Sequence, residues 1–108
     1  MEKFLLLFEK ENLADNSPQQ MQNHLREWLA WMKFLKDHYI YIFGDPIESA
    51  GRLISGKNKV ISNNTLVKEN INGFMVIQAE GFQKAIEITK SCPVFHVDGK
   101  LEIRQIIS

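Results

Sequence analysis

The chain has only one cysteine, no excess of either charge and no long apolar run among its 108 residues. Because Cys92 is alone, neither an intramolecular disulfide nor a cluster of metal-binding cysteines can form. Thirteen basic residues balance thirteen acidic ones, so no basic field favours nucleic acid or an anionic membrane as a partner. No stretch approaches the roughly 20 apolar residues that a membrane-spanning helix needs.

The N-terminal apolar run, Phe4 to Phe8, is shorter than the hydrophobic region of a signal peptide, and Glu2 and Glu9 flank it. Hydrophobic residues make up 44% of the chain, which supports a packed core, and the length suits one domain. We therefore expect a single cytoplasmic domain over residues 1–108 that needs no cofactor.

The first two predicted elements are a strand and a long amphipathic helix. The apolar run is too short for a typical helix and favours a strand buried on both faces. Ser17 and Gln20 form a capping box around Pro18, so a helix begins there and ends near Asp37 or His38. Its predicted apolar face comprises Met21, Leu25, Trp28, Leu29, Met32 and Leu35.

The later segments complete a recognisable order of elements. Strands are predicted in YIYIFGDP, GFMVIQA and KLEIRQII, a β-hairpin in RLISGKNKVIS, and a second helix in EGFQKAIEITKSC, which Pro93 ends. The order β-α-β, hairpin, β-α-β predicts an α+β, ferredoxin-like domain with an antiparallel sheet and both helices on one face.

The face of this sheet that the helices leave open is also expected to be apolar. Residues 5–7 and 75–77 are consecutive apolar residues in the middle of predicted strands, so both faces of those strands carry apolar side chains. A second copy of the chain is the simplest cover for such a face. We therefore expect a homodimer built sheet to sheet.

Several segments together resemble the YCII-related proteins, and most closely the branch named for an Asp-Gly-Pro-Phe motif. These segments are NSPQQMQNHLREWLAWM, GRLISGKNKVIS and NGFMVIQAEGFQKAIEITKSCPVFHVDGKLEIRQI. The resemblance implies a dimeric α+β barrel of ferredoxin-like subunits. Most members of the family have no assigned activity, but the wider superfamily includes dehydrochlorinases and, more distantly, monooxygenases and isomerases.

The chain departs from the family where the named motif should stand. It has SNNTLVKEN there, and an amide at Asn63 cannot act as the base that an acid could. Lys68 and Glu69 match the family's Lys-Glu pair, which makes Lys68 a candidate ligand-binding residue. The helix histidine of the enzymatic branch aligns with Glu27, and its pre-proline aspartate aligns with Cys92.

His24 is the main candidate for chemistry because histidine titrates near neutral pH. It lies at the margin of the predicted stripe, where it is either a general base or a boundary residue bonded to water or a carbonyl. Asp45 or Glu69 could assist it. Trp28 is expected to pack in the core or to line a ligand cavity. Trp31 is expected at an edge or interface, where its N–H needs a partner.

The remaining candidates have ordinary alternatives. Arg104 could hold a carboxylate ligand, or it could form an exposed pair with Glu102. His96 and Asp98 are too few to hold a metal ion, so no metal site is predicted. Cys92, at the expected end of a helix, should have a raised thiol pKa and little reactivity.

Three functions fit these residues. The first is a small-molecule-binding protein with a cleft between sheet and helices. The second is a cofactor-independent lyase or isomerase acting on a small aromatic or keto acid with His24 as its base. The third, implied by the resemblance alone, is an interaction module linked to sigma-factor regulation.

Overall fold

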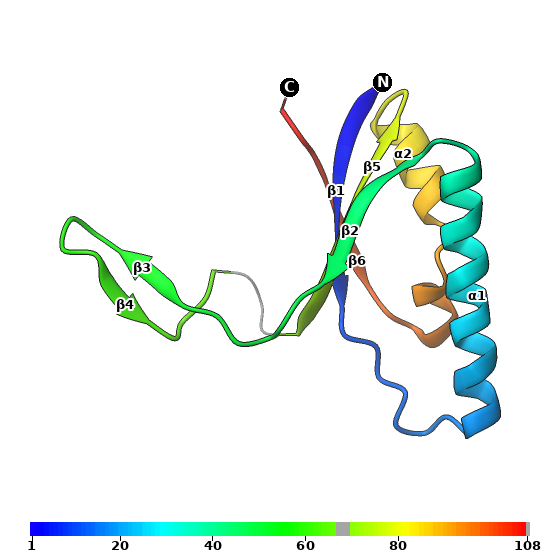
Figure 1. The fold of residues 1–108 in the computed structure, drawn as a ribbon, viewed down its shortest axis with the longest axis horizontal. Helices are drawn as coiled ribbons and strands as arrows, with labels where there is room; N and C mark the ends of the chain where they lie inside the picture. Colours follow the sequence, from blue (N-terminus) through cyan, green and yellow to red (C-terminus); the bar gives the residue numbers. More distant parts are fainter. Residues whose placement is uncertain (67–69, 108) are drawn as a thin grey trace.

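The computed structural model describes residues 1–66 and 70–107 and shows a four-stranded sheet, two α-helices and a projecting hairpin (Figure 1). In chain order the elements are β1 (Glu2–Glu9), α1 (Pro18–Asp37), β2 (Tyr41–Pro46), β3 (Leu53–Ser55), β4 (Val60–Ser62), β5 (Ile71–Ala79), α2 (Phe82–Thr89), the 3-10 helix η1 (Pro93–Val97) and β6 (Leu101–Gln105). None of the helices in these described residues is long and apolar enough to cross a membrane.

The main sheet has the order β2-β5-β1-β6, and each neighbouring pair is antiparallel. This is the predicted ferredoxin-like arrangement, in which each helix connects two strands that are separated by another strand. Successive side chains of a strand point to opposite faces. Phe4, Leu6 and Phe8 therefore face the helices, whereas Leu5 and Leu7 face the other side.

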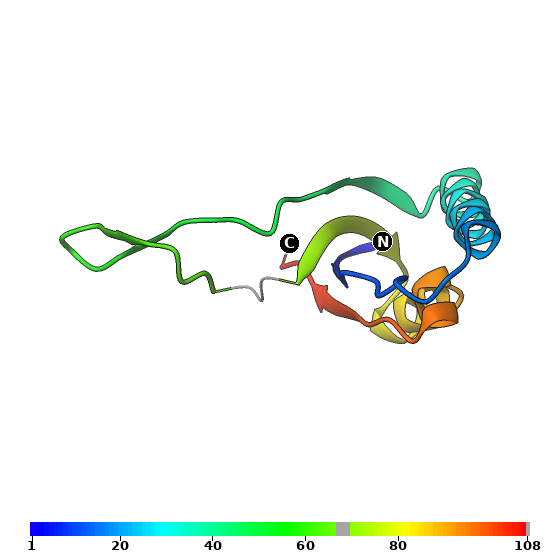
Figure 2. The same cartoon turned by 90° about the horizontal axis from the view of Figure 1, so that it is seen from below.

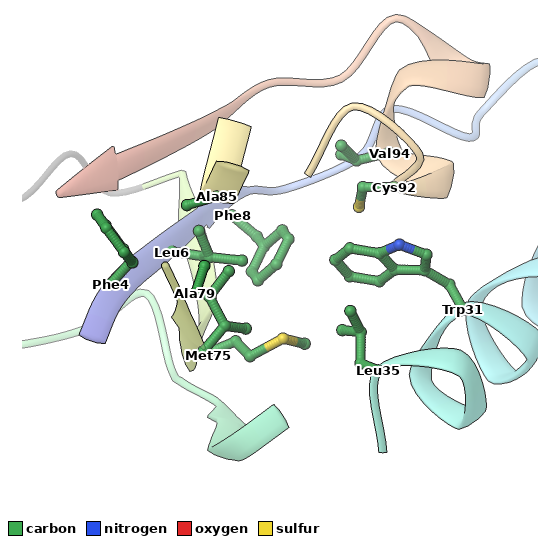
Figure 3. Packing of buried hydrophobic residues seen from close by; sticks show 11 residues of the cluster. Phe4, Leu6, Phe8, Trp31, Leu35, Met75, Ala79, Ala85, Cys92 and Val94 are labelled. Atoms are coloured by element: carbon green, nitrogen blue, oxygen red, sulfur yellow. The ribbon is translucent and has the colours of Figure 1, made fainter. Parts of the chain in front are cut away.

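The core fills the space between the sheet and the helices (Figure 3). Phe4 and Leu6 of β1, Ile77 of β5 and Leu35 of α1 have no solvent exposure. Burying side chains of this size stabilises the fold by about 1.5–3 kcal/mol each. Because these side chains occupy the interior, a ligand pocket must lie at its margins.

Helix α1 begins as predicted, but the face that it buries matches the predicted one only in part. Ser17 accepts a bond from the Gln20 backbone N–H while the Gln20 side chain accepts one from the Ser17 N–H, so the capping box is present. Half of the predicted apolar stripe is confirmed, because Leu35 is buried and Trp28 and Met32 pack against the core. The other half was wrong: Met21, Leu25 and Leu29 are exposed, and His24 and Trp31 are buried instead.

The buried face of α1 carries ring nitrogens that need hydrogen-bond partners. Trp31 donates its indole N–H to the hydroxyl of the exposed Ser91 at 2.9 Å, so the expected partner exists at the margin of the core. The prediction that Trp31 would lie at an edge was therefore wrong, because its exposed fraction is 5%. A buried ring is tolerated when its nitrogen is bonded.

The second helix is shorter than predicted, and a second short helix follows it. Cys92 is extended, and Pro93 then begins η1, which was not predicted. Asp98 adopts a left-handed conformation after η1, and Gly99 donates its N–H to the Val94 carbonyl at 2.8 Å. A Cβ on Gly99 would come within 2.7 Å of that oxygen, so glycine permits this close turn.

The other face of the sheet is open in the single chain. β1, β5 and β2 place Leu5, Leu7, Phe74 and Phe43 on it, and Phe43 is 51% exposed. The β3–β4 hairpin, with its flanking segments, projects from this side of the sheet, whereas α1, α2 and η1 lie on the opposite side (Figures 1 and 2). We call residues 47–66 the arm.

Cys92 is fully buried in the core, near Trp31 (Figure 3). Burial raises the pKa of its thiol from 9.0 to about 12. The raised pKa was predicted, but from a helix C-terminus. The structure instead places Cys92 at the N-cap of η1, and desolvation of the thiolate is the main cause.

We expect the thiol to make stability fall at alkaline pH. Between the unfolded pKa of 9.0 and the native pKa of about 12, the unfolded chain releases the thiol proton and the native chain retains it. The free energy of unfolding therefore decreases as pH rises through this window, and the thiol has no such effect below it. Urea unfolding at several pH values should give a shallower decrease for Cys92→Ala, and equal slopes would contradict the assignment.

Candidate functional site

His24 lies inside the molecule with its ring nitrogen Nε2 against a carboxylate from the loop before α1. Its exposed fraction is 5%, and Nε2 is 2.7 Å from Glu11 Oε2. The indole N–H of Trp28, one turn further along α1, is 3.3 Å from the same oxygen. One carboxylate therefore accepts from two rings that the helix presents side by side.

The hydrogen positions follow from what each group can donate. Trp28 Nε1 is also 3.2 Å from His24 Nε2, but an indole nitrogen only donates. Glu11 as a carboxylate only accepts, so Nε2 carries a proton and donates to it. The Trp28 N–H is then directed to Glu11 as well. In neutral His24 the remaining lone pair is on Nδ1.

His24 Nδ1 is buried and has no hydrogen-bond partner. The nearest ionisable group is Glu27, whose Oε1 is 3.8 Å away, too far for a hydrogen bond. The other Glu27 oxygen is 2.6 Å from Nδ1 of His96 in η1. The Glu27 carboxylate thus lies between two imidazole rings. It bonds the ring of His96 and is too far from the ring of His24 to bond it.

An open pocket of about 430 Å³ borders this cluster between α1 and η1. Its walls are mostly polar, and they are formed by Asn12, Asn16, Gln20, Asn23, His24, Glu27, His96, Val97 and Asp98. The Glu27 and His96 side chains are 45% and 54% exposed, so both reach solvent from the wall that covers His24. The pocket can therefore accommodate a small polar molecule next to His24.

The cluster does not form a metal centre. In residues 1–66 and 70–107, no group of three or more His, Cys, Asp or Glu side chains is arranged to hold a metal ion. His96 bonds Glu27 and does not form a pair of metal ligands with Asp98. The side chains of the cluster offer hydrogen bonding and proton transfer.

The other predicted site residues lie elsewhere. Asp45 is exposed opposite Phe74, and Arg104 is opposite Leu5, so both are on the open face, away from His24. Arg104 bonds Glu102, which corresponds to the predicted exposed pair. An open pocket of about 410 Å³ on that side includes Arg104. Lys68 and Glu69 lie outside the described residues.

Sequence reasoning missed the two carboxylates that define the site. Glu11 is 13 residues before His24, in a loop whose path no periodicity encodes. Glu27 was considered only as the position that aligns with a family histidine. The i, i+3 spacing of His24 and Glu27 was the one local signal, because residues three apart share a helix surface.

Trp28, predicted to pack in the core, is half-buried and packs against Phe8.

Comparisons with known proteins agree with this fold. The family described as the YCII-related domain matches residues 2–108. No curated protein shows significant similarity to the chain. Among solved structures, the chain is similar to 5-chloro-2-hydroxyhydroquinone dehydrochlorinase from Burkholderia phenoliruptrix, solved in complex with 2,5-dihydroxybenzoquinone. The TM-score is 0.54 at 14% identity, over 96% of this chain and 93% of that one.

We expect Glu11 to contribute more to stability than other carboxylates of its loop. Glu11→Gln removes the charge that accepts from His24 and Trp28, and it should lower the free energy of unfolding by about 1–3 kcal/mol. Asp15→Asn is the matched control, because Asp15 is exposed in the same loop and should change stability by less than about 0.5 kcal/mol. Urea unfolding measures both; equal losses would contradict the role of Glu11.

Proposed function

We propose that this chain, which belongs to the YCII-related family, binds a small hydroxylated organic molecule in the pocket between α1 and η1. The observation that carries the proposal is the unpartnered, buried Nδ1 of His24 at the wall of that pocket. A buried acceptor without a partner costs about 1–3 kcal/mol, and a ligand hydroxyl could recover this by donating to it.

The wall favours a ligand that donates hydrogen bonds. Nδ1 and the Glu27 carboxylate are both acceptors, and they are 3.8 Å apart at their closest atoms. A hydroxyl that approached from the pocket could donate to either acceptor after the exposed Glu27 side chain rotated. The hydroxylated ring bound by the similar dehydrochlorinase is consistent with this ligand class.

A second candidate function is proton-transfer catalysis, as in a cofactor-independent lyase or isomerase. The pairing of Glu11 with His24 favours it, because a carboxylate bonded to one ring nitrogen orients the imidazole and stabilises its protonated form. In this scheme Nδ1 accepts the proton of a ligand hydroxyl and later returns it. Asp45 is not part of this scheme, since it lies on the open face.

Resorcinol, a stable diphenol, should stabilise the protein, whereas 1,3-dimethoxybenzene should not, because it has the same ring but no donor. At about ten times its Kd, a ligand of the native state adds about 1.4 kcal/mol, or about 4–8 °C in Tm for a domain of this size. Thermal unfolding with each compound measures the difference. Equal shifts from the two compounds would refute donation to the site.

Site variants separate binding from catalysis. His24→Gln and Glu27→Gln should abolish the resorcinol shift, with exposed His38→Gln as the control that keeps it. Glu27 is partly exposed, so this variant folds even where loss of buried His24 is not tolerated. In D2O, catalysed exchange of resorcinol ring protons would support proton transfer. The rate of this exchange should fall by at least about 100-fold in the His24→Gln variant, in which Glu27 is unchanged.

We further propose that a second copy covers the open face of the sheet. Leu5, Leu7, Phe74 and Phe43 form an apolar surface on it, while Arg104, Glu102 and Asp45 supply both charges. A surface with both charges can be complementary to its own copy across a two-fold axis. The protein would then be a homodimer built sheet to sheet.

Phe43→Lys should convert this dimer to a monomer, because a charge on the covered face would be desolvated. Phe95→Lys is the matched control, since Phe95 is 44% exposed but lies in η1, behind the sheet. Size-exclusion chromatography with light scattering at micromolar concentration gives the mass of each. A monomeric mass for the unmodified chain would overturn the proposed dimer.

A further inference from the structure

The arm presents an apolar face that its own chain leaves uncovered. Ile54 of β3 is paired directly with Ile61 of β4, so their side chains share one face of the hairpin. They are 63% and 67% exposed. On the other face, Ser55 is paired with Val60 and Leu53 with Ser62, so each pair contains a serine. The Ile54–Ile61 face is therefore the more apolar of the two.

The hairpin has too few interactions to be stable alone. Its strands have three residues each and form a two-stranded sheet separate from the main sheet. An isolated two-stranded hairpin is at best marginally stable in water. A surface that packs on the Ile54–Ile61 face would supply the missing stabilisation.

The position of the arm indicates which molecule supplies that surface. In two perpendicular views the arm projects from the open side of the sheet, while the helices lie on the other side (Figures 1 and 2). Packed sheets are about 10 Å apart, and three strand residues span about 10 Å. When a second chain packs on the open face, the flank of that second chain therefore lies within reach of the arm.

Charge also points to a second copy as the partner. The arm includes three basic residues, Arg52, Lys57 and Lys59, and one acidic residue, Glu48. With 13 basic and 13 acidic residues in the whole chain, the remainder has ten basic against twelve acidic residues. The arm is thus positive and the rest of the chain is negative, so the arm of one copy is attracted to the body of another.

We propose that the arm clasps the second copy, packing its Ile54–Ile61 face on the flank of the partner's body. This inference rests on the dimer proposed above. A two-fold axis applies the same contact twice, so each copy contributes one arm and receives one. The open face and the arm, the two uncovered apolar surfaces on one side of the molecule, are then buried in a single association.

Paired variants of the arm test the proposal. Ile61→Lys should raise the Kd of the dimer at least about tenfold, because a lysine replaces a buried apolar side chain. Val60→Lys is the matched control, with 58% exposure, the adjacent position and the opposite face. Sedimentation equilibrium measures both. An effect at Ile61 no larger than that at Val60 would overturn the inference.

Hydrogen exchange separates failure of the clasp from failure of the dimer. In the unmodified chain, amides of β3 and β4 should be protected above the dimer Kd and should lose protection on dilution, while β1 stays protected. A dimer whose arm exchanges freely would overturn the clasp and leave the sheet-to-sheet dimer standing. A monomer at every concentration would overturn both, and an arm equally protected in the monomer would overturn the clasp alone.

Discussion

The rotation of α1 about its axis turns three ring nitrogens inward, and it depends on the acceptors that satisfy them. His24, Trp28 and Trp31 donate from the inward side of the helix, and Glu11 and Ser91 accept these hydrogen bonds. Without those acceptors the helix would bury desolvated N–H groups, at a cost of about 1–3 kcal/mol each. The core, the pocket and the exposed leucines of α1 all follow from this orientation.

Elements were easier to predict than the face that each one buries. The capping box at Ser17, the turn residues of the hairpin and the β-branched runs are local signals, and they located strands and helices correctly. The apolar stripe on α1 was only half correct because hydropathy counts histidine as polar and leucine as apolar. It cannot register that a distant carboxylate makes His24 the better interior residue, while Leu25 remains outside.

The candidate site was predictable only in part for the same reason. His24 was identifiable from its chemistry and its place beside the stripe. Glu11 and His96 come from a loop and from a short 3-10 helix, and their approach to α1 depends on tertiary packing that no spacing encodes. Asp45 and Arg104 illustrate the converse: the two-residue period of a strand, once the register is known, places them on the other side of the sheet.

The sheet divides the molecule into two regions with different chemistry. The helix side carries a polar pocket with imidazole and carboxylate groups, and the open side carries aromatic and aliphatic groups with scattered charges. No described side chain of the pocket cluster takes part in the open face. The proposed ligand binding and the proposed self-association could therefore change independently in related sequences.

The five residues of the 3-10 helix η1 contribute both to the core and to the pocket. Val94 is fully buried in the core, while His96, two residues later, bonds Glu27 at the pocket. The close turn at Gly99 ties the same segment to β6. Natural variation in residues 92–99 must therefore satisfy packing and recognition at once, so this short segment should change more slowly during evolution than the longer surface of α1.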